Sequence, residues 1–389
     1  MKRARFGRRS GLPREAEELL RLAGGLAESH SRAEDAFWEQ KLADAVDELL
    51  QAGQEDSLNA ALDHLYASST QGYEELADML ESRAECGAER RTDSNVLLLA
   101  APLLAWSRFS IPSSTLPATV LANLRVHLSA HVLADGVKLA VADALFSPDQ
   151  LPQGYCETAR FAAELGACAL RNQDLQVDQE TLPETSRFLS DVRYVLFAIA
   201  ARPGAPLFSW QEGDGTRDVA AAQWRTQGGA CLTPLLAGCA TETVLPDAFF
   251  AGCREADSAS RPYSVRASVA FLSTTLDLPP NKLRAVVAPF HDRQLEEYRI
   301  GFTTTDSNNV LHGVVWPLLG AEDDSADVPA QIDAALRECG ISEILQLDQR
   351  FPLEYCDDCG APMYPSPDGE VAHAELPEDK AEQVPKHLH

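Results

Sequence analysis

Two cysteines near the end of the chain form its clearest chemical motif. Cys356 and Cys359 are separated by two residues and followed by Gly360. In this knuckle, backbone amides turn toward two thiolates that bind one tetrahedral metal ion. We expect a zinc ion held in this way to be structural. A redox dithiol is disfavoured, because the pair does not open a helix that would lower the pKa of a thiol.

A complete zinc site needs four ligands, and the second Cys-x-x-Cys pair of a zinc ribbon is missing from this chain. His373, which follows a predicted turn at residues 365–368, is the third candidate ligand. Cys253 is the fourth candidate. The chain contains an internal repeat, described below, in which Cys253 has nearly the position that Glu354 has in a later copy. Cys253 would therefore approach Cys356 if the repeated modules stack side by side in register. The alternatives to a zinc site are a relic knuckle or two free thiols.

Three aspartates recur at the predicted ends of strands, where open α/β sheets bind their ligands. They are Asp143, Asp247 and Asp348. A carboxylate in this place accepts a hydrogen bond from a hydroxyl, an amine or a guanidinium group, so we predict that the three are ligand-binding residues of a cleft. The alternative is structural, because aspartate also caps helices and satisfies backbone amides in turns.

An internal repeat indicates the modules that would position these residues. Trp106 and Trp210 are each followed, 37 positions later, by an Asp-Ala-x-Phe motif that begins at Asp143 or Asp247. A degraded third copy starts at Trp316 and has an interval of 32 positions. Such intervals suit a strand, a crossover helix and a parallel strand. Self-similarity at this period favours duplicated α/β modules over a short-period solenoid.

We therefore predict an α/β fold with an N-terminal helical segment, about three duplicated βαβ-like modules and a short C-terminal Cys-x-x-Cys knuckle. The chain begins with a predicted basic disordered arm (1–13) and a helical domain (14–90). Three α/β modules follow, module 1 at 95–190, module 2 at 191–280 and module 3 at 281–355. A zinc-knuckle-like hairpin (356–374) and a disordered tail (375–389) complete the prediction.

Local patterns give more detail on three of these parts. Apolar residues recur at helical spacing throughout residues 14–90, which predicts four helices with short connections. The continuous apolar run 96–101 suits a strand that is buried on both faces. The third module is expected to begin with an antiparallel pair of strands, at 284–288 and 297–302.

The charge balance limits the partners of the chain. With 33 Lys and Arg against 59 Asp and Glu, the net charge is −26, which argues against broad binding to nucleic acids or anionic membranes. The N-terminal arm is the exception, because five of its first nine residues are basic, and contact with RNA would run through it. Nine cysteines in a large chain fit reduced thiols, and we expect a cytoplasmic location with no membrane contact.

Fingerprints of common enzymes are missing: the sequence has no Gly-x-x-x-x-Gly-Lys loop, no Gly-x-Gly-x-x-Gly after a strand and no Gly-x-Ser-x-Gly elbow. The leading prediction is a non-catalytic cytoplasmic scaffold or regulatory binding protein with an unidentified protein partner. One alternative is an enzyme or small-ligand sensor with a cleft at the strand carboxyl ends. Another is an RNA-associated or ribosome-associated protein. Zinc is the one cofactor indicated.

Several segments resemble an uncharacterised family of proteobacterial proteins known as a domain of unknown function. The resemblance is carried by residues 12–20, 297–302, 312–320 and 355–365, which include the Tyr-Cys-Asp-Asp-Cys-Gly-Ala-Pro-Met-Tyr-Pro run. It spans most of the chain and implies a bacterial, soluble protein. No activity and no site residue are implied by it.

Overall fold

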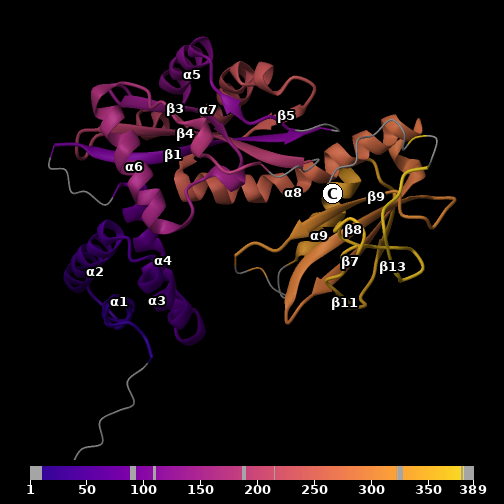
Figure 1. The fold of residues 1–389 in the computed structure, drawn as a ribbon, viewed down its shortest axis with the longest axis horizontal. Coiled ribbons are helices and arrows are strands. Elements are labelled where there is room, and N and C mark those ends of the chain that lie inside the picture. Colours follow the sequence, from indigo (N-terminus) through magenta and orange to yellow (C-terminus); the bar gives the residue numbers. More distant parts are fainter. Residues whose placement is uncertain are drawn as a thin grey trace, which may run out of the picture.

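The computed structural model describes residues 11–87, 93–107, 111–185, 190–213, 215–320, 322, 327–377 and 380. The basic residues of the predicted arm and residues 381–389 of the predicted tail lie outside these ranges. A helical bundle, a first sheet and a second sheet follow one another along the chain (Figure 1). The protein therefore has a mixed α/β fold.

The N-terminal segment consists of helices, as the apolar spacing predicts. These are α1 (Arg14–Ala27), α2 (Arg32–Ala52), α3 (Glu55–Ser68) and α4 (Thr70–Glu85). The Ser31 side chain caps α2 by accepting from the backbone amide of Glu34, and Gly53 ends this helix with a φ of +68°. Cys156 and Ala159 of α6 (Gly154–Arg171) join the leucine core of the bundle, which therefore packs against the first sheet's own helices.

The first sheet is antiparallel, with the strand order β2-β3-β4-β1-β5 and β6 also paired with β1. In chain order its strands are β1 (Asn95–Trp106), β2 (Ser114–Thr115), β3 (Lys138–Phe146), β4 (Ser190–Ala201), β5 (Ala240–Thr243) and β6 (Asp247–Ala248). Alternate residues of β1 enter two different cores, so the apolar run 96–101 is buried on both faces as predicted.

The first two motif copies fall on two strand–helix–strand units of this one sheet. One unit is β1, α5 (Ala118–His131) and β3, and the other is β4, α7 (Arg217–Gln223) and β5. The strands of each unit run in the same direction, but a strand of the other unit lies between them. Two interlocked split units of this kind form a ferredoxin-like arrangement, here with α6 inserted between them.

Helices cover both faces of the first sheet. On one face, Leu124 and Leu128 of α5 pack beside Trp224, which follows α7 in a single π-helical turn. On the other face lie α6 and the first half of the long helix α8 (Phe249–Leu276), through residues such as Leu165 and Ala256. The sheet is therefore the middle layer of three.

The second sheet has the order β10-β7-β8-β9. Its members are β7 (Leu283–His291), β8 (Leu295–Thr304), β9 (His312–Pro317), β10 (Glu343–Gln346) and the short β11 (Phe351–Pro352). The predicted antiparallel start is confirmed, because β7 pairs with β8. β10 and β11 run parallel to β7, after the crossover helix α9 (Val328–Glu338).

Helix α8 connects the two sheets, and Figure 1 shows it reaching from one to the other. Its second half packs with α9 on one face of the second sheet, where Val265 and Leu272 meet Ile332. The opposite face is covered by the C-terminal hairpin of β12 (Tyr364–Pro365) and β13 (Val371–Ala372). Within the described ranges, the helices are too short or too polar to cross a membrane.

Candidate metal centre

The Cys-x-x-Cys motif lies in a tight turn that a short antiparallel bridge closes. Tyr355 pairs with Pro362 across the turn, and the amide of Cys356 donates to the carbonyl of Ala361 at 2.7 Å. Gly360 donates back to the Cys356 carbonyl at 2.8 Å and has a φ of +74°, a conformation that favours glycine. The glycine after the second cysteine therefore lets the chain reverse directly behind the two thiols.

A second turn brings the histidine to the thiols. After β12, Ser366 accepts from the Gly369 amide at 3.0 Å and donates its own amide to Glu370 at 2.8 Å. β13 then runs back along β12 and ends just before His373. The turn that the sequence predicts at 365–368 is therefore present, and it places the imidazole beside the Cys-x-x-Cys turn.

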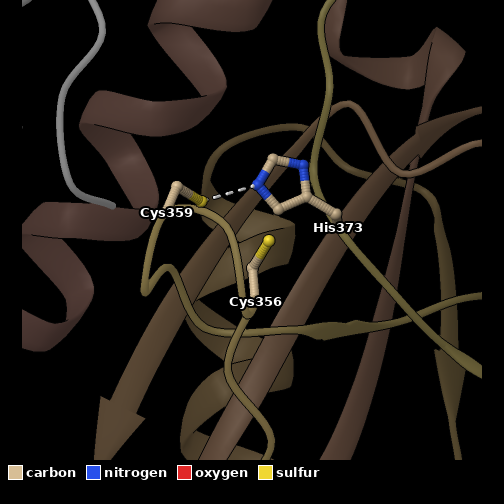
Figure 2. A group of neighbouring side chains, drawn as sticks. All are labelled: Cys356, Cys359 and His373. Atoms are coloured by element: carbon tan, nitrogen blue, oxygen red, sulfur yellow. Dashed lines mark hydrogen bonds between the residues drawn. The ribbon is translucent and has the colours of Figure 1, made fainter.

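The three side chains point toward one another (Figure 2). Their ligand atoms all lie within 4.8 Å of each other, and the Sγ of Cys359 is 3.3 Å from Nε2 of His373. Tetrahedral zinc, with bonds of about 2.3 Å to sulfur and 2.0 Å to nitrogen, separates such atoms by about 3.5 to 3.8 Å. Small side-chain movements would bring Cys356, Cys359 and His373 to that spacing, so the residues present fit a zinc ion.

The surroundings of two ligands favour metal binding. The amides of Cys359 and Asp358, and then the Cys359 thiol, lower the pKa of the Cys356 thiol by hydrogen bonding, which favours the thiolate form. The carboxylate of Glu375 lies 3.3 Å from Nδ1 of His373, within ion-pair range although without hydrogen-bond geometry. A small rotation that completes a hydrogen bond from Nδ1 to this carboxylate would fix the imidazole with its Nε2 toward a bound metal ion.

A buried arginine supports the turn from below. Arg299 of β8 is fully buried, and its Nη1 donates to the carbonyls of Glu354 and Met363 at 2.6 and 2.8 Å. These carbonyls stand on the two sides of the Cys-x-x-Cys turn. The Nε of Arg299 donates to Glu297 at 2.6 Å, so the guanidinium joins the sheet to both ends of the turn.

A pair of glycines makes room for the hairpin on the second sheet. Gly301 and Gly313 are partners across β8 and β9. A Cβ at Gly313 would lie 2.2 Å from the ring of Tyr364, and one at Gly301 would lie 2.2 Å from the carbonyl oxygen of Pro365. β12 therefore lies directly on the backbone of the sheet, with the Tyr364 ring fully buried.

The proposed fourth ligand is elsewhere. Cys253 lies in α8 and packs at the edge of the first sheet's core, and burial raises the pKa of its thiol to about 12. Within the described part of the chain, no fourth Cys, His, Asp or Glu joins the group. The assignment of Cys253 depended on modules that stack in register, whereas the first two units share one sheet and the third lies in the other.

The three predicted aspartates do not converge on one cleft. Asp143 lies inside β3, which continues to Phe146, and its Oδ1 accepts from the Val177 amide at 2.7 Å. Asp247 begins β6, where it accepts from its neighbour's amide and pairs with Arg217. These contacts match the structural alternative. Asp348 alone follows the carboxyl end of its strand, β10.

Asp348 lines a cleft of about 250 Å³ at the carboxyl ends of the parallel strands β7 and β10. Its neighbours in the lining include His291, Tyr298 and Arg350. Both ring nitrogens of His291 are shielded from solvent, and neither has a hydrogen-bond partner among the described residues. Buried polar atoms are nearly always paired, so this histidine requires an explanation.

Sequence reasoning missed the supporting residues of the centre. Glu375 could have been found from the sequence, because it lies two positions after His373 and a metal-bound imidazole usually has a carboxylate partner. Arg299 carried no such signal, since an arginine in a strand gives no hint that it will be fully buried.

The fold and this site define a mixed α/β protein with a Cys-Cys-His group on a C-terminal hairpin. The chain matches the model of the family described as "Protein of unknown function (DUF2863)" over residues 4–387 and belongs to that family. The resemblance to a family of unknown function is thereby confirmed. No curated protein and no solved structure matches the chain.

Proposed function

We propose that this protein is a non-catalytic, cytoplasmic scaffold or regulatory binding protein whose C-terminal hairpin holds one structural zinc ion. The observation that carries the metal assignment is the convergence of Cys356, Cys359 and His373, with ligand atoms within 4.8 Å of one another. Zinc suits this donor set of two thiolates and one imidazole.

The anchoring of the hairpin supports a structural role for the zinc. Three ligands come from a segment that has little apolar core of its own, in which Tyr364 and Ala374 pack with Val310. A metal ion that joins both turns of so small a unit contributes directly to its folding free energy. The fourth position of the ion lies at the surface beside the exposed Cys359, where a residue of a partner protein would complete the closed four-ligand set of a structural site.

The state of the cysteines supports the cytoplasmic location. All nine are free thiols in the structure. Disulfides are rare in reducing compartments, where free thiols and metal-bound thiolates persist.

Native mass spectrometry of the full-length protein tests the metal assignment. We expect one zinc ion per chain, lost on denaturation and lost in the Cys356→Ser variant. Cys339→Ser, which alters a half-buried thiol at the end of α9, is the matched control and should retain the ion. Stoichiometric zinc in Cys356→Ser would contradict the assignment.

A small-ligand sensor is the second candidate function, and the unpaired histidine in the Asp348 cleft favours it. Ligands of α/β sheets bind beyond the carboxyl ends of parallel strands, and a polar group in this cleft would supply the partner that His291 lacks once its ring turns toward the cleft. Binding to the folded state raises the thermal midpoint by mass action. A metabolite set that stabilises the wild type, but not Asp348→Asn, would establish this function.

A test for turnover distinguishes both candidate functions, the scaffold and the small-ligand sensor, from an enzyme. The same metabolite set, incubated with the purified protein and followed by mass spectrometry, should remain unchanged. A product that forms with the wild type and not with Asp348→Asn would overturn the non-catalytic proposal.

A further inference from the structure

A cleft of about 640 Å³ lies between α6 and the segment 175–183, just beyond the carboxyl end of β3. Its floor is apolar and is formed by Phe146, Leu151, Phe161, Leu175, Val177 and Leu182. Five of these side chains are only partly buried at the edge of the first core, while Phe146 is fully covered. The cleft thus exposes apolar surface that the fold itself leaves uncovered.

The rim of this cleft is acidic. Four exposed carboxylates belong to the lining, namely Asp149, Glu157, Glu164 and Asp178. Arg160 is the single basic residue of the lining. Its Nη2 lies 3.8 Å from Glu157, and both side chains are more than half exposed, so this pair contributes little. The rim therefore keeps a net negative charge.

Glu157, Asp178 and Glu164 of the rim have lone-pair positions that contacts within the protein do not use. Glu157 accepts the Gln153 amide with one oxygen, and Asp178 accepts the Glu180 amide with one oxygen. The side chain of Glu164, on α6, makes no hydrogen bond or ion pair with another described residue. An ionised carboxylate offers about four lone-pair positions. Cationic side chains can therefore bind here without breaking contacts of the fold.

Hydrogen bonds within the protein fix one wall of the cleft. The Gln150 side chain accepts from the Ser147 amide at 3.0 Å and from the Ser113 hydroxyl at 2.6 Å. Its amide group donates to the carbonyl of Pro183 at 3.0 Å. These bonds join the loop after β3 to the end of the segment 175–183. A ligand would therefore spend little binding free energy on ordering this wall.

We propose that this cleft, the acidic groove, binds a short cationic amphipathic peptide segment of a partner protein. An apolar side chain of the segment covers the floor, and flanking Lys or Arg residues pair with the carboxylates of the rim. The inference deepens the proposed function, on which it rests, by naming the chemistry of the partner. The charge of the chain, −26, adds long-range attraction for such a segment.

The probe for the test is a fluorescent nine-residue peptide of alternating arginine and leucine, measured by fluorescence anisotropy with the full-length protein. We expect saturable binding that weakens as salt rises from about 0.05 to 0.5 M, because the ion pairs lie at the surface. The same peptide with glutamate for arginine, or with serine for leucine, should bind at least tenfold more weakly. Equal binding of either analogue would overturn the proposal.

Matched charge reversals locate the binding site. Glu164→Lys should weaken binding of the arginine–leucine peptide about tenfold, whereas Asp63→Lys, on an exposed position of α3, changes the net charge equally and should weaken it less than twofold. Leu182→Ser tests the floor and should also weaken binding. Equal losses in both lysine variants would mean non-specific attraction to an acidic protein and would overturn the assignment.

Failure of this inference and failure of the proposed function give different results. A protein that binds zinc and turns over no metabolite, yet shows no salt-sensitive peptide binding, would refute the acidic groove and leave the proposed function standing. A protein with turnover would refute the proposed function, whatever the peptide result.

Discussion

Gly313 lies against the ring of Tyr364, so closely that a Cβ at this glycine would meet a ring carbon at 2.2 Å. The ring is fully buried and belongs to the short strand that leads from the Cys-x-x-Cys turn to His373. Because Gly313 has no side chain, the hairpin can lie close to the sheet at this position. The same hairpin carries Cys356, Cys359 and His373, so its position on the sheet affects where these three candidate ligands lie.

Gly313→Ala should therefore destabilise the C-terminal unit and weaken zinc binding. Overpacking of a full core costs about 1–3 kcal/mol, and the Tyr364 ring has no free space to move into. Urea unfolding and competition with a chromophoric zinc chelator would measure the two effects. Gly24→Ala in α1 is the control, because a Cβ there meets nothing within 4 Å, and it should raise stability by up to about 1 kcal/mol.

Removal of the metal should loosen the hairpin selectively. With zinc extracted by a chelator, we expect faster amide exchange within residues 355–374, where few apolar contacts hold the chain. The N-terminal helices have their own leucine core and should keep their protection. Hydrogen exchange followed by mass spectrometry compares the two regions in one sample. Unchanged exchange at 355–374 would argue against a structural zinc ion.

The local part of the site was predictable and the distant part was not. The Cys-x-x-Cys-Gly spacing and the turn before His373 depend on a few neighbouring residues, and the structure brings these three side chains together. Cys253 depended on how whole modules pack, which no local pattern specifies. Asp143 was misplaced for a similar reason, because the apolar run of β3 continues past it to Phe146.

The same limit applies to the fold. Strand and helix positions follow from local periodicity. The order of the strands does not, because β4 lies between β1 and β3 and pairs with strands that are about fifty or more residues away in the sequence. Helix α8 was not predicted as one long helix. It contains Pro262, and its two halves pack against different sheets. Ala256 of the first half lies in the core of the first sheet, whereas Val269 of the second half lies in the core of the second sheet. A single amphipathic stripe is therefore absent.

Arg299 should be among the most sensitive positions of the second sheet. Arg299→Leu would leave the Glu297 carboxylate and the Met363 carbonyl without their donor, while the Glu354 carbonyl keeps the Met363 amide, and the loss of one partner from a buried pair costs about 3–5 kcal/mol. Arg337→Leu on α9 removes an exposed pair with Asp333 and should cost less than about 1 kcal/mol. Urea denaturation of both variants measures the difference. Equal costs would mean that the buried arginine does not anchor the turn.

Glu85, at the end of α4, should make stability depend on pH. Burial against α8, opposed in part by a hydrogen bond from the Phe250 amide, raises the pKa of this carboxyl to about 7. Between pH 4.5 and about 7, the folded state keeps a proton that the unfolded state has released. The free energy of unfolding therefore falls as pH rises through this range, by up to about 3 kcal/mol from this group.

Glu85→Gln removes the titration and keeps the size of the side chain. We expect the variant to be more stable than the wild type at pH 8, and the difference between them to shrink steadily toward pH 4.5. Urea denaturation at several pH values measures this difference, which cancels contributions from other groups. Glu48→Gln, at an exposed position of α2, is the control and should follow the wild type at every pH. A constant difference between Glu85→Gln and the wild type would show that folding does not raise the pKa of this carboxyl.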